Sequence, residues 1–143
     1  MSKQIFISLP VADVARSTAF YAAIGCEKNA QFSNDRASSM VWSDAITFNL
    51  LDHDLYATLT TRPIADTHAT SGALFALQLA SRADVDAITE AALAAGGKEA
   101  HGPEDEGFMY SRAFWDPDGH AFGPMWMDLD VFKTAPQPDT AAA

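Results

Sequence analysis

The residues of this chain best suited to chemistry are four histidines and two acidic runs. No two histidines have the His-x-x-x-His spacing of a helix or the His-x-His spacing of a strand, which would direct two imidazoles to one metal ion. Residues 52–54 (Asp-His-Asp) are consecutive and point in different directions, and residues 104–106 (Glu-Asp-Glu) lie between a proline and a glycine. Both runs therefore favour solvated turns, and these patterns assign no catalytic residue. The histidines are His53, His68, His101 and His120.

Other reactive motifs are missing or unfavourably placed. The chain has no Gly-x-Ser-x-Gly sequence, which would mark a nucleophilic serine on a sharp turn. The single cysteine, Cys26, follows a predicted helix end, so no helix N-terminus activates it, and it cannot form an intramolecular disulfide. Gly96-Gly97 also ends a predicted helix, where the negative pole of the dipole disfavours phosphate.

The composition narrows the class of protein. The chain has 143 residues with a net charge of −10, which predicts a single domain, 1–143, that repels nucleic acid and anionic membranes. The N-terminus lacks a basic region followed by a long apolar run, and no apolar stretch is long enough to span a membrane. We therefore expect a cytoplasmic protein with no nucleic-acid or membrane partner.

The first half of the chain reads as strand, helix and three strands. Residues 4–9 are apolar and β-branched, and Pro10 is expected to end the ladder. Asp13 is a suitable N-cap for a helix that runs to Ile24, and Gly25 supplies the C-cap. Three strands are predicted near 27–33, 37–43 and 45–51, followed by a connecting loop at 53–71.

The second half repeats this order. Residues 72–80 form an apolar strand, and Ser81 with Asp84 matches a capping box for a helix that ends at Gly96. Residues 116–119 (Asp-Pro-Asp-Gly) predict a tight turn, after which His120 is expected as a packed, half-buried imidazole. The remaining strands are predicted near 98–101, 108–115 and 120–127, and residues 129–143 are expected to form a disordered tail.

The spacing of caps is the same in both halves. Gly25 follows Asp13 by twelve positions, and Gly96 follows Asp84 by twelve positions. Such self-similarity predicts an internal repeat, with units of about 4–52 and 72–128. The fold class is therefore α+β, built of two βαβββ modules.

Two segments resemble a known family. Residues 5–21 (Ile-Phe-Ile-Ser-Leu-Pro-Val-Ala-Asp-Val-Ala-Arg-Ser-Thr-Ala-Phe-Tyr), closed by Ile24-Gly25, are similar to the opening of vicinal oxygen chelate proteins. Residues 114–120 (Phe-Trp-Asp-Pro-Asp-Gly-His) resemble the closing turn of that superfamily, which includes glyoxalase, bleomycin-resistance and extradiol dioxygenase proteins. The resemblance covers roughly 4–128 and implies curled mixed sheets around a cup. It also implies a homodimer.

The same resemblance locates the family's metal ligands, which are His, Gln or Glu. The first-strand position is Phe6, the fourth-strand position is Asn49, the fifth-strand position is Leu74 or Leu77, and the last-strand position is Gly123. Only the amide of Asn49 offers a donor, and it is a weak one. We therefore expect no metal and no cofactor. Pro124, within the last strand, suggests a local bulge.

Strand alternation then defines a candidate binding site in the cup. With Phe6, Asn49 and Gly123 inward, the residues two positions away share that face, and the seventh strand is expected to add a ring and a cation. The candidate ligand-binding residues are Phe6, Ser8, Thr47, Asn49, Gln78, Tyr110, Arg112 and Met125.

Three functions remain open at this point. The first is a metal-free protein that binds a small apolar or aromatic molecule, with cationic ligands favoured by the acidic surface. The second is a metal-dependent lyase, epimerase or dioxygenase with an unusual site. The third is a non-catalytic structural or regulatory dimer.

Overall fold

The structure is a computed structural model, and it describes residues 3–131. Two four-stranded sheets have the strand orders β1-β4-β3-β2 and β5-β8-β7-β6, and one long helix follows the first strand of each. This confirms the α+β fold of two βαβββ repeats. The elements in chain order are β1 (Ile5–Val11), α1 (Val14–Ala23), β2 (Glu27–Lys28), η1 (Ala30–Phe32), β3 (Ala37–Ser43), β4 (Ile46–Asp52), α2 (His53–Ala57), β5 (Leu74–Gln78), α3 (Arg82–Ala94), β6 (Lys98–Asp105), β7 (Met109–Trp115) and β8 (Ala121–Met127).

Local signals position both long helices. The side chain of Asp13 accepts a hydrogen bond from the amide of Arg16 at 3.0 Å, and Ser81 accepts one from the amide of Asp84 at 3.1 Å. Gly25 and Gly96 follow the two helices with φ angles of +112° and +105°, the left-handed conformation that favours glycine. Helix α3 begins after Ser81 and is therefore a turn longer at its start than the repeat spacing from Asp84 predicts.

Several predicted boundaries are wrong. Strand β1 continues through Pro10 to Val11, because an edge strand needs amide partners on one side only. The strand predicted at 27–33 is reduced to two residues, since Asn29 caps the short helix η1. Residues 52–54 are not a plain turn: Asp52 caps helix α2 by accepting from the amide of Leu55 at 2.7 Å.

The second sheet also differs in detail from the prediction. Strand β6 extends to Asp105, so Glu104 lies at the end of a strand and not in a loop. The expected bulge at Pro124 is absent, because the pairs on both sides of it, in 109–111 and 114–115, keep one register with β8. The predicted tail lies outside the described residues from 132 onward.

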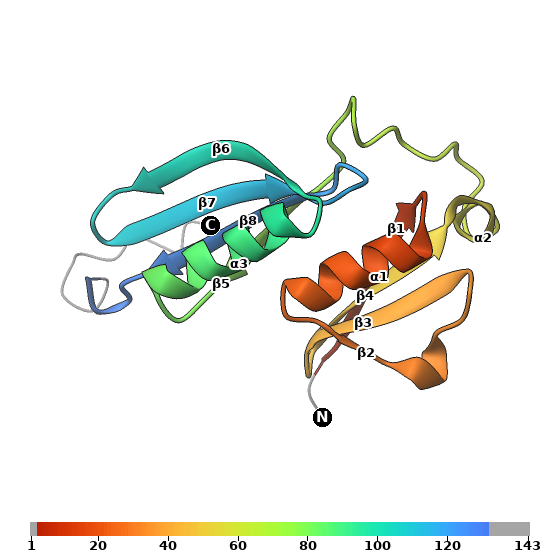
Figure 1. The fold of residues 1–143 in the computed structure, drawn as a ribbon, viewed down its shortest axis with the longest axis horizontal. Helices are drawn as coiled ribbons and strands as arrows, with labels where there is room; N and C mark the ends of the chain where they lie inside the picture. Colours follow the sequence, from red (N-terminus) through yellow and green to blue (C-terminus); the bar gives the residue numbers. More distant parts are fainter. Residues whose placement is uncertain (1–2, 132–143) are drawn as a thin grey trace, which may run out of the picture.

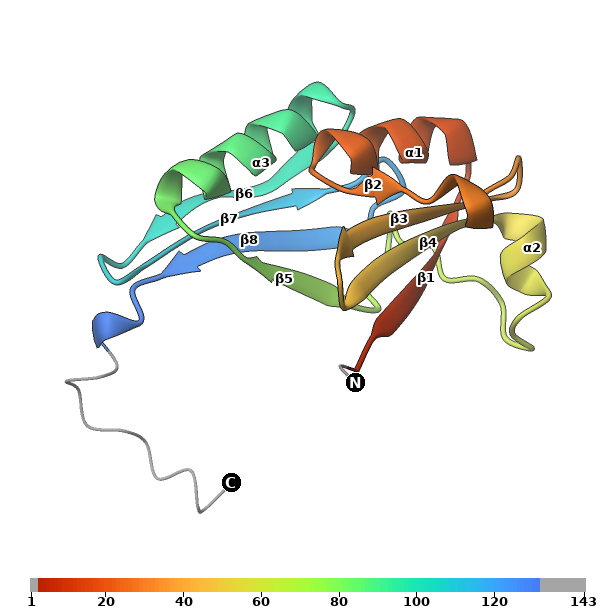
Figure 2. The same cartoon turned by 90° about the horizontal axis from the view of Figure 1, so that it is seen from below.

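The two modules share one apolar core. Figure 2 shows α1 and α3 side by side above both sheets, while Figure 1 shows α3 over the second sheet at the left and α1 over the first sheet at the right. Phe48 of the first sheet and Phe122 of the second have ring centroids 5.6 Å apart, and Tyr21 of α1 contacts both rings. Each sheet thus has a helix-covered face and an opposite face, called here the open face. No described helix is both long and apolar enough to cross a membrane.

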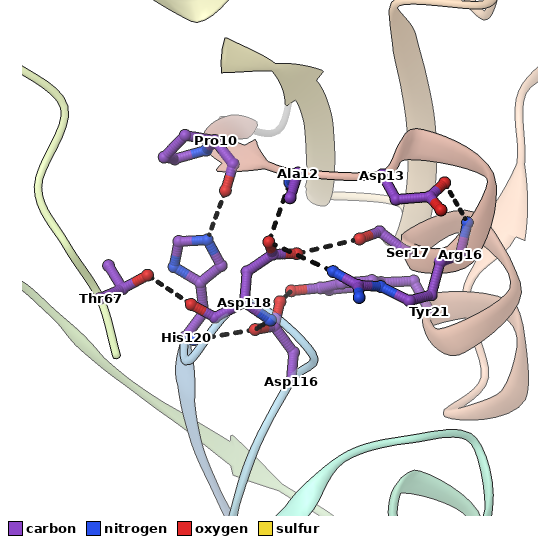
Figure 3. A network of polar contacts seen from close by, with 10 residues as sticks. All are labelled: Pro10, Ala12, Asp13, Arg16, Ser17, Tyr21, Thr67, Asp116, Asp118 and His120. Carbon is purple, nitrogen blue, oxygen red and sulfur yellow. Dashed lines mark hydrogen bonds and ion pairs between the residues drawn. The ribbon is translucent and has the colours of Figure 1, made fainter. Parts of the chain in front are cut away.

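A polar junction fixes the turn between β7 and β8 against the first module (Figure 3). The carboxylate of Asp118 accepts hydrogen bonds from the amide of Ala12 at 2.9 Å and from the hydroxyl of Ser17 at 3.2 Å. The backbone carbonyl of Asp118 accepts another from the hydroxyl of Thr67, in the linker, at 2.5 Å. The turn therefore ties together β1, α1 and the linker.

The second carboxylate of this junction is Asp116, which is 3% exposed. It accepts hydrogen bonds from the hydroxyl of Tyr21 at 2.7 Å and from the amides of Asp118 and His120 at 2.9 and 2.8 Å. Burial raises the pKa of Asp116, and the charge of His120 and the hydrogen bond from Tyr21 oppose that rise. Burial and the charge of Asp116 in turn raise the pKa of Tyr21.

Candidate functional site

The open face of the first sheet carries a cavity of about 540 Å³, within the size range of small-molecule sites. Phe6 and Phe32 supply aromatic walls and are 62% and 68% exposed. Between them, Thr47 and Asn49 on β4 offer a hydroxyl and an amide. Asp44 is the one charged side chain among the described residues of the lining, so the centre of this cavity is neutral.

Strand alternation correctly places most of the candidate residues. Phe6, Thr47 and Asn49 line this first cavity together. Ser8 pairs with Asn49 on the same face of the sheet, but it lines a second cavity at the other side of β1. The binding role of these residues remains a prediction.

Two other candidates lie on the open face of the second sheet. Gln78 pairs with Met125 across β5 and β8, and Met125 pairs with Ser111 across β8 and β7. The first cavity does not include either candidate, nor does the second. The structure therefore does not bring the predicted set into one pocket.

The expectation that Tyr110 and Arg112 face the cup is wrong. Tyr110 pairs with Trp126 and donates its hydroxyl hydrogen to Asp86 on α3 at 2.6 Å, so the ring lies on the helix-covered side. Arg112 shares that face, and Ser111 and Ala113 occupy the open face in their place. The register of the β7–β8 hairpin, with Trp115 opposite Ala121, decides this orientation.

Arg112 is instead the centre of a structural ion cluster. Its guanidinium group contacts Asp86 at 3.2 Å, Glu90 at 2.9 Å and Glu99 at 3.0 Å. Burial disfavours the charge, but the three carboxylates outweigh that penalty, so the pKa of Arg112 is raised. Both terminal nitrogens of this cation are paired on the helix-covered side, while its buried Nε has no hydrogen-bond partner among the described residues. The cation is therefore not available to a ligand of the cup.

The residues at the inherited metal-ligand positions do not fit a metal ion. The start of α3 after Ser81 selects Leu74 as the fifth-strand position, and Leu74 is 80% exposed on the open face. Gly123 lies on the same face and has no side chain, and Phe6 offers only a ring. Across the described residues, no three His, Cys, Asp or Glu side chains are grouped so that they could hold a metal. One amide, that of Asn49, does not bind a transition metal against water.

The second cavity, called here the seam cavity, was not anticipated from the sequence. It measures about 1310 Å³ and lies between the edge of β1, the linker and the open face of the second sheet. The turn in the sequence is a signal for it: Asp116 lies opposite His120, so Trp115 lies opposite Ala121, on the face of Gly123. Its polar and aromatic lining includes Thr67, His68, Lys98, His101, Trp115 and His120.

The two βαβββ modules and their shared core define the fold class, and comparisons with known proteins identify the family. The sequence model of the Glyoxalase/Bleomycin resistance protein/Dioxygenase superfamily matches residues 3–123, so the chain belongs to that family. No curated protein matches the sequence.

Solved structures share the fold at low sequence identity. A glyoxalase/bleomycin resistance protein/dioxygenase family enzyme from Burkholderia phytofirmans has a TM-score of 0.74 at 14% identity, covering 88% of this chain and 99% of that one. The fosfomycin resistance protein FosX from Mesorhizobium loti gives 0.67 at 16%, covering 94% and 99%. A lactoylglutathione lyase from Agrobacterium tumefaciens gives 0.63 at 18%, covering 88% and 94%. These likenesses show the fold alone.

Proposed function

We propose that this protein binds a small, uncharged aromatic molecule on the open face of its first sheet, without a resident metal ion. The observation that carries the proposal is the chemistry of the first cavity. Two exposed rings, Phe6 and Phe32, flank the hydroxyl of Thr47 and the amide of Asn49. Aromatic walls with a few neutral hydrogen-bonding groups suit a planar molecule that has one or two polar atoms.

The net charge of −10 adds a preference among such molecules. An acidic surface attracts cations and repels anions over the distance of a Debye length, so a neutral or weakly basic aromatic molecule is favoured over an acid. The proposal includes a cytoplasmic location, which a single buried cysteine, Cys26, suits.

The proposal also includes a homodimer. Three large apolar side chains on the open faces are strongly exposed: Phe6 at 62%, Leu74 at 80% and Trp115 at 41%. A second copy that covered these faces would remove this apolar surface from water and close the cups. Sedimentation equilibrium at micromolar concentration is the test, and a monomer there contradicts this part.

Binding is tested with N-phenyl-1-naphthylamine, a neutral aromatic amine whose fluorescence rises in apolar sites. We expect saturable binding, weakened about fivefold by Asn49→Leu or Thr47→Val, because each substitution removes one hydrogen bond. Phe6→Ala is expected to weaken it about tenfold through the lost ring contact. Leu59→Ala, an exposed apolar residue outside both cavities, is the matched control. Equal affinity in all four variants contradicts the assignment of this cavity.

Elemental analysis of protein purified without a chelator or a His-tag tests the proposed lack of a resident metal ion. We expect far less than one transition metal per chain. About one zinc, nickel, iron or manganese per chain, lost on Asn49→Ala, overturns the metal-free proposal and favours a metal-dependent lyase, epimerase or dioxygenase.

A further inference from the structure

Among the inherited metal-ligand positions, only Asn49 has a side chain that can form hydrogen bonds. The residue is half-buried on β4 and lines the first cavity. No described residue forms a hydrogen bond with the oxygen or the NH2 group of its side-chain amide. The amide therefore has both an acceptor and a donor available to a ligand.

The lining of the first cavity contains two other side-chain amides, and each already has one end engaged. Nε2 of Gln4 donates to the backbone carbonyl of Asp44 at 3.2 Å. Oδ1 of Asn29 accepts from the backbone amide of Gln31, also at 3.2 Å. A contact made through both ends of an amide needs both ends free, so Asn49 is the amide of this lining best suited to one.

The register of the first sheet places Asn49 in a polar row. Strand β4 lies between β1 and β3 (Figure 2), and Asn49 lies opposite Ser8 on one of them and Ser39 on the other. On the same face of β4, Thr47 and Leu51 lie two positions away in the two directions along the strand. The amide is thus flanked by neutral side chains, which leave its two ends uncharged and unpaired.

An aromatic wall lies beside this row. Phe6 lies opposite Thr47, which makes it a diagonal neighbour of Asn49, and an aromatic side chain reaches across such a diagonal. The Phe6 ring is 62% exposed on the open face. A planar ligand stacked against Phe6 can therefore turn one edge toward the amide of Asn49.

An amide with both ends free recognises an edge that carries a hydrogen-bond donor next to an acceptor. Its oxygen accepts from the N–H group of the ligand, and its NH2 group donates to the neighbouring carbonyl or ring nitrogen, as asparagine does with the edge of adenine. Lactams and amino-substituted nitrogen heterocycles have such edges. The amide of Asn49 is uncharged, so a neutral edge of this kind matches it without any counter-charge.

We infer that the first cavity takes a planar, neutral nitrogen heterocycle whose edge carries an N–H group beside a hydrogen-bond acceptor, held by two hydrogen bonds to the amide of Asn49. This inference rests on the function proposed above and adds the chemical class of the ligand. At a position where the superfamily places a metal donor, this chain has an amide that binds the ligand directly. The mismatch between Asn49 and a metal site is thus explained by a different mode of recognition.

Two isomers, 2-quinolone and 4-quinolone, test the inference. Both are neutral bicyclic rings with the same atoms, but only 2-quinolone has its N–H and carbonyl groups side by side. Calorimetric titration is expected to show about fivefold tighter binding of 2-quinolone, because 4-quinolone can form only one of the two hydrogen bonds with Asn49. Equal affinities for the two isomers overturn the inference.

Substitutions assign this preference to one side chain. Asn49→Leu is expected to bind the two isomers equally, whereas Gln31→Leu, the same change at an exposed amide outside both cavities, keeps the fivefold preference. Asn49→Asp keeps the shape of the side chain and lacks the N–H donor, so it is expected to favour protonated 2-aminoquinoline, which has two adjacent donors, over 2-quinolone. Circular dichroism checks that all three variants are folded. A preference for 2-quinolone over 4-quinolone that survives in Asn49→Leu or Asn49→Asp overturns the inference.

N-phenyl-1-naphthylamine separates failure of this inference from failure of the proposed function. Its single N–H group cannot form both hydrogen bonds, so its binding reports on the cavity and not on recognition of a donor–acceptor edge. A parent protein that binds the amine but does not prefer 2-quinolone overturns the inference and leaves the proposed function in place. A parent protein that binds neither the amine nor the quinolones overturns both.

Discussion

Removal of the Tyr21 hydroxyl tests whether the polar junction stabilises the assembly of the two modules. Tyr21 is fully buried and donates to Asp116 at 2.7 Å, across 95 positions of sequence. A hydrogen bond to a charged group contributes about 1.5–3 kcal/mol, and Tyr21→Phe leaves the carboxylate of Asp116 without one of its three donors. We expect the free energy of unfolding to fall by about 2 kcal/mol at pH 7, which corresponds to a drop in Tm of about 4–8 °C.

The pH dependence of this loss has a definite sign. Burial raises the pKa of Asp116 in the folded protein, and the Tyr21 hydrogen bond lowers it, so Tyr21→Phe raises that pKa further. A carboxyl whose folded pKa is raised above its unfolded value stabilises the fold at low pH and loses that contribution as pH rises through the folded pKa. As the pH rises to neutral, the free energy of unfolding of the variant therefore falls by more than that of the parent protein. The difference is about 1.4 kcal/mol for each unit by which the substitution raises the pKa of Asp116.

Urea unfolding of the parent protein and the variant, at pH 7 and at an acidic pH where both remain folded, measures these differences. Tyr56→Phe is the control, because the Tyr56 hydroxyl has no hydrogen bond among the described residues and the ring is only half-buried. A Tyr21→Phe loss no larger than that of Tyr56→Phe would refute the reasoning. The reasoning would also be refuted if the drop in the free energy of unfolding caused by Tyr21→Phe stayed constant, or grew, as the pH was lowered.

Three further predictions concern other buried features. Arg112→Met is expected to lower the free energy of unfolding by about 2 kcal/mol in urea titrations, because three carboxylates lose their shared cation while solvent screens part of their repulsion; a neutral result contradicts the cluster's role. Gly119 has a φ of +89°, and a Cβ there would collide with the carbonyl oxygen of Thr67, so Gly119→Ala should lower the free energy of unfolding in urea by about 2 kcal/mol or more. Gly72→Ala, where a Cβ would meet nothing within 4 Å, should lower it little, and equal losses contradict the steric argument. Burial raises the pKa of Cys26 to about 12, so Ellman's reagent should label the folded protein about a thousandfold more slowly than the unfolded chain, and rapid labelling of folded protein contradicts that burial.

Features set by nearby residues could be predicted from the sequence. The caps Asp13 and Ser81, the C-terminal glycines Gly25 and Gly96, and the turn at 116–119 all depend on contacts a few residues apart, and each is found as expected. The order of strands and helices follows from them. The topology of each sheet then follows from the repeat, because two similar units fold in the same way.

Features set by distant residues could not be predicted in this way. The faces of Tyr110 and Arg112 depend on which residue of β8 lies opposite each, and a shift of one position reverses every side chain. The seam cavity depends on where β1 and the linker lie relative to the second sheet, and Thr67 joins the linker to the β7–β8 turn through its hydrogen bond to Asp118. The contact between Nε2 of His120 and the backbone carbonyl of Pro10, 110 positions away, likewise depends on how the two modules are placed.

The positions of the family's recognisable residues explain why membership defines the fold so well and the chemistry so poorly. Asp13 caps α1, Gly25 ends it, and Asp116 and Asp118 join the modules through buried hydrogen bonds. All of these contacts lie on the helix-covered side or in the turns, where loss of one destabilises the protein whatever it binds. The ligand-binding positions lie on the open faces, where Phe6 or Leu74 can replace a metal donor without any loss of folding contacts, since both side chains are mostly exposed. A sequence can therefore keep the superfamily's whole structural framework and still carry a different site, so the function has to be established by substitutions on the open faces.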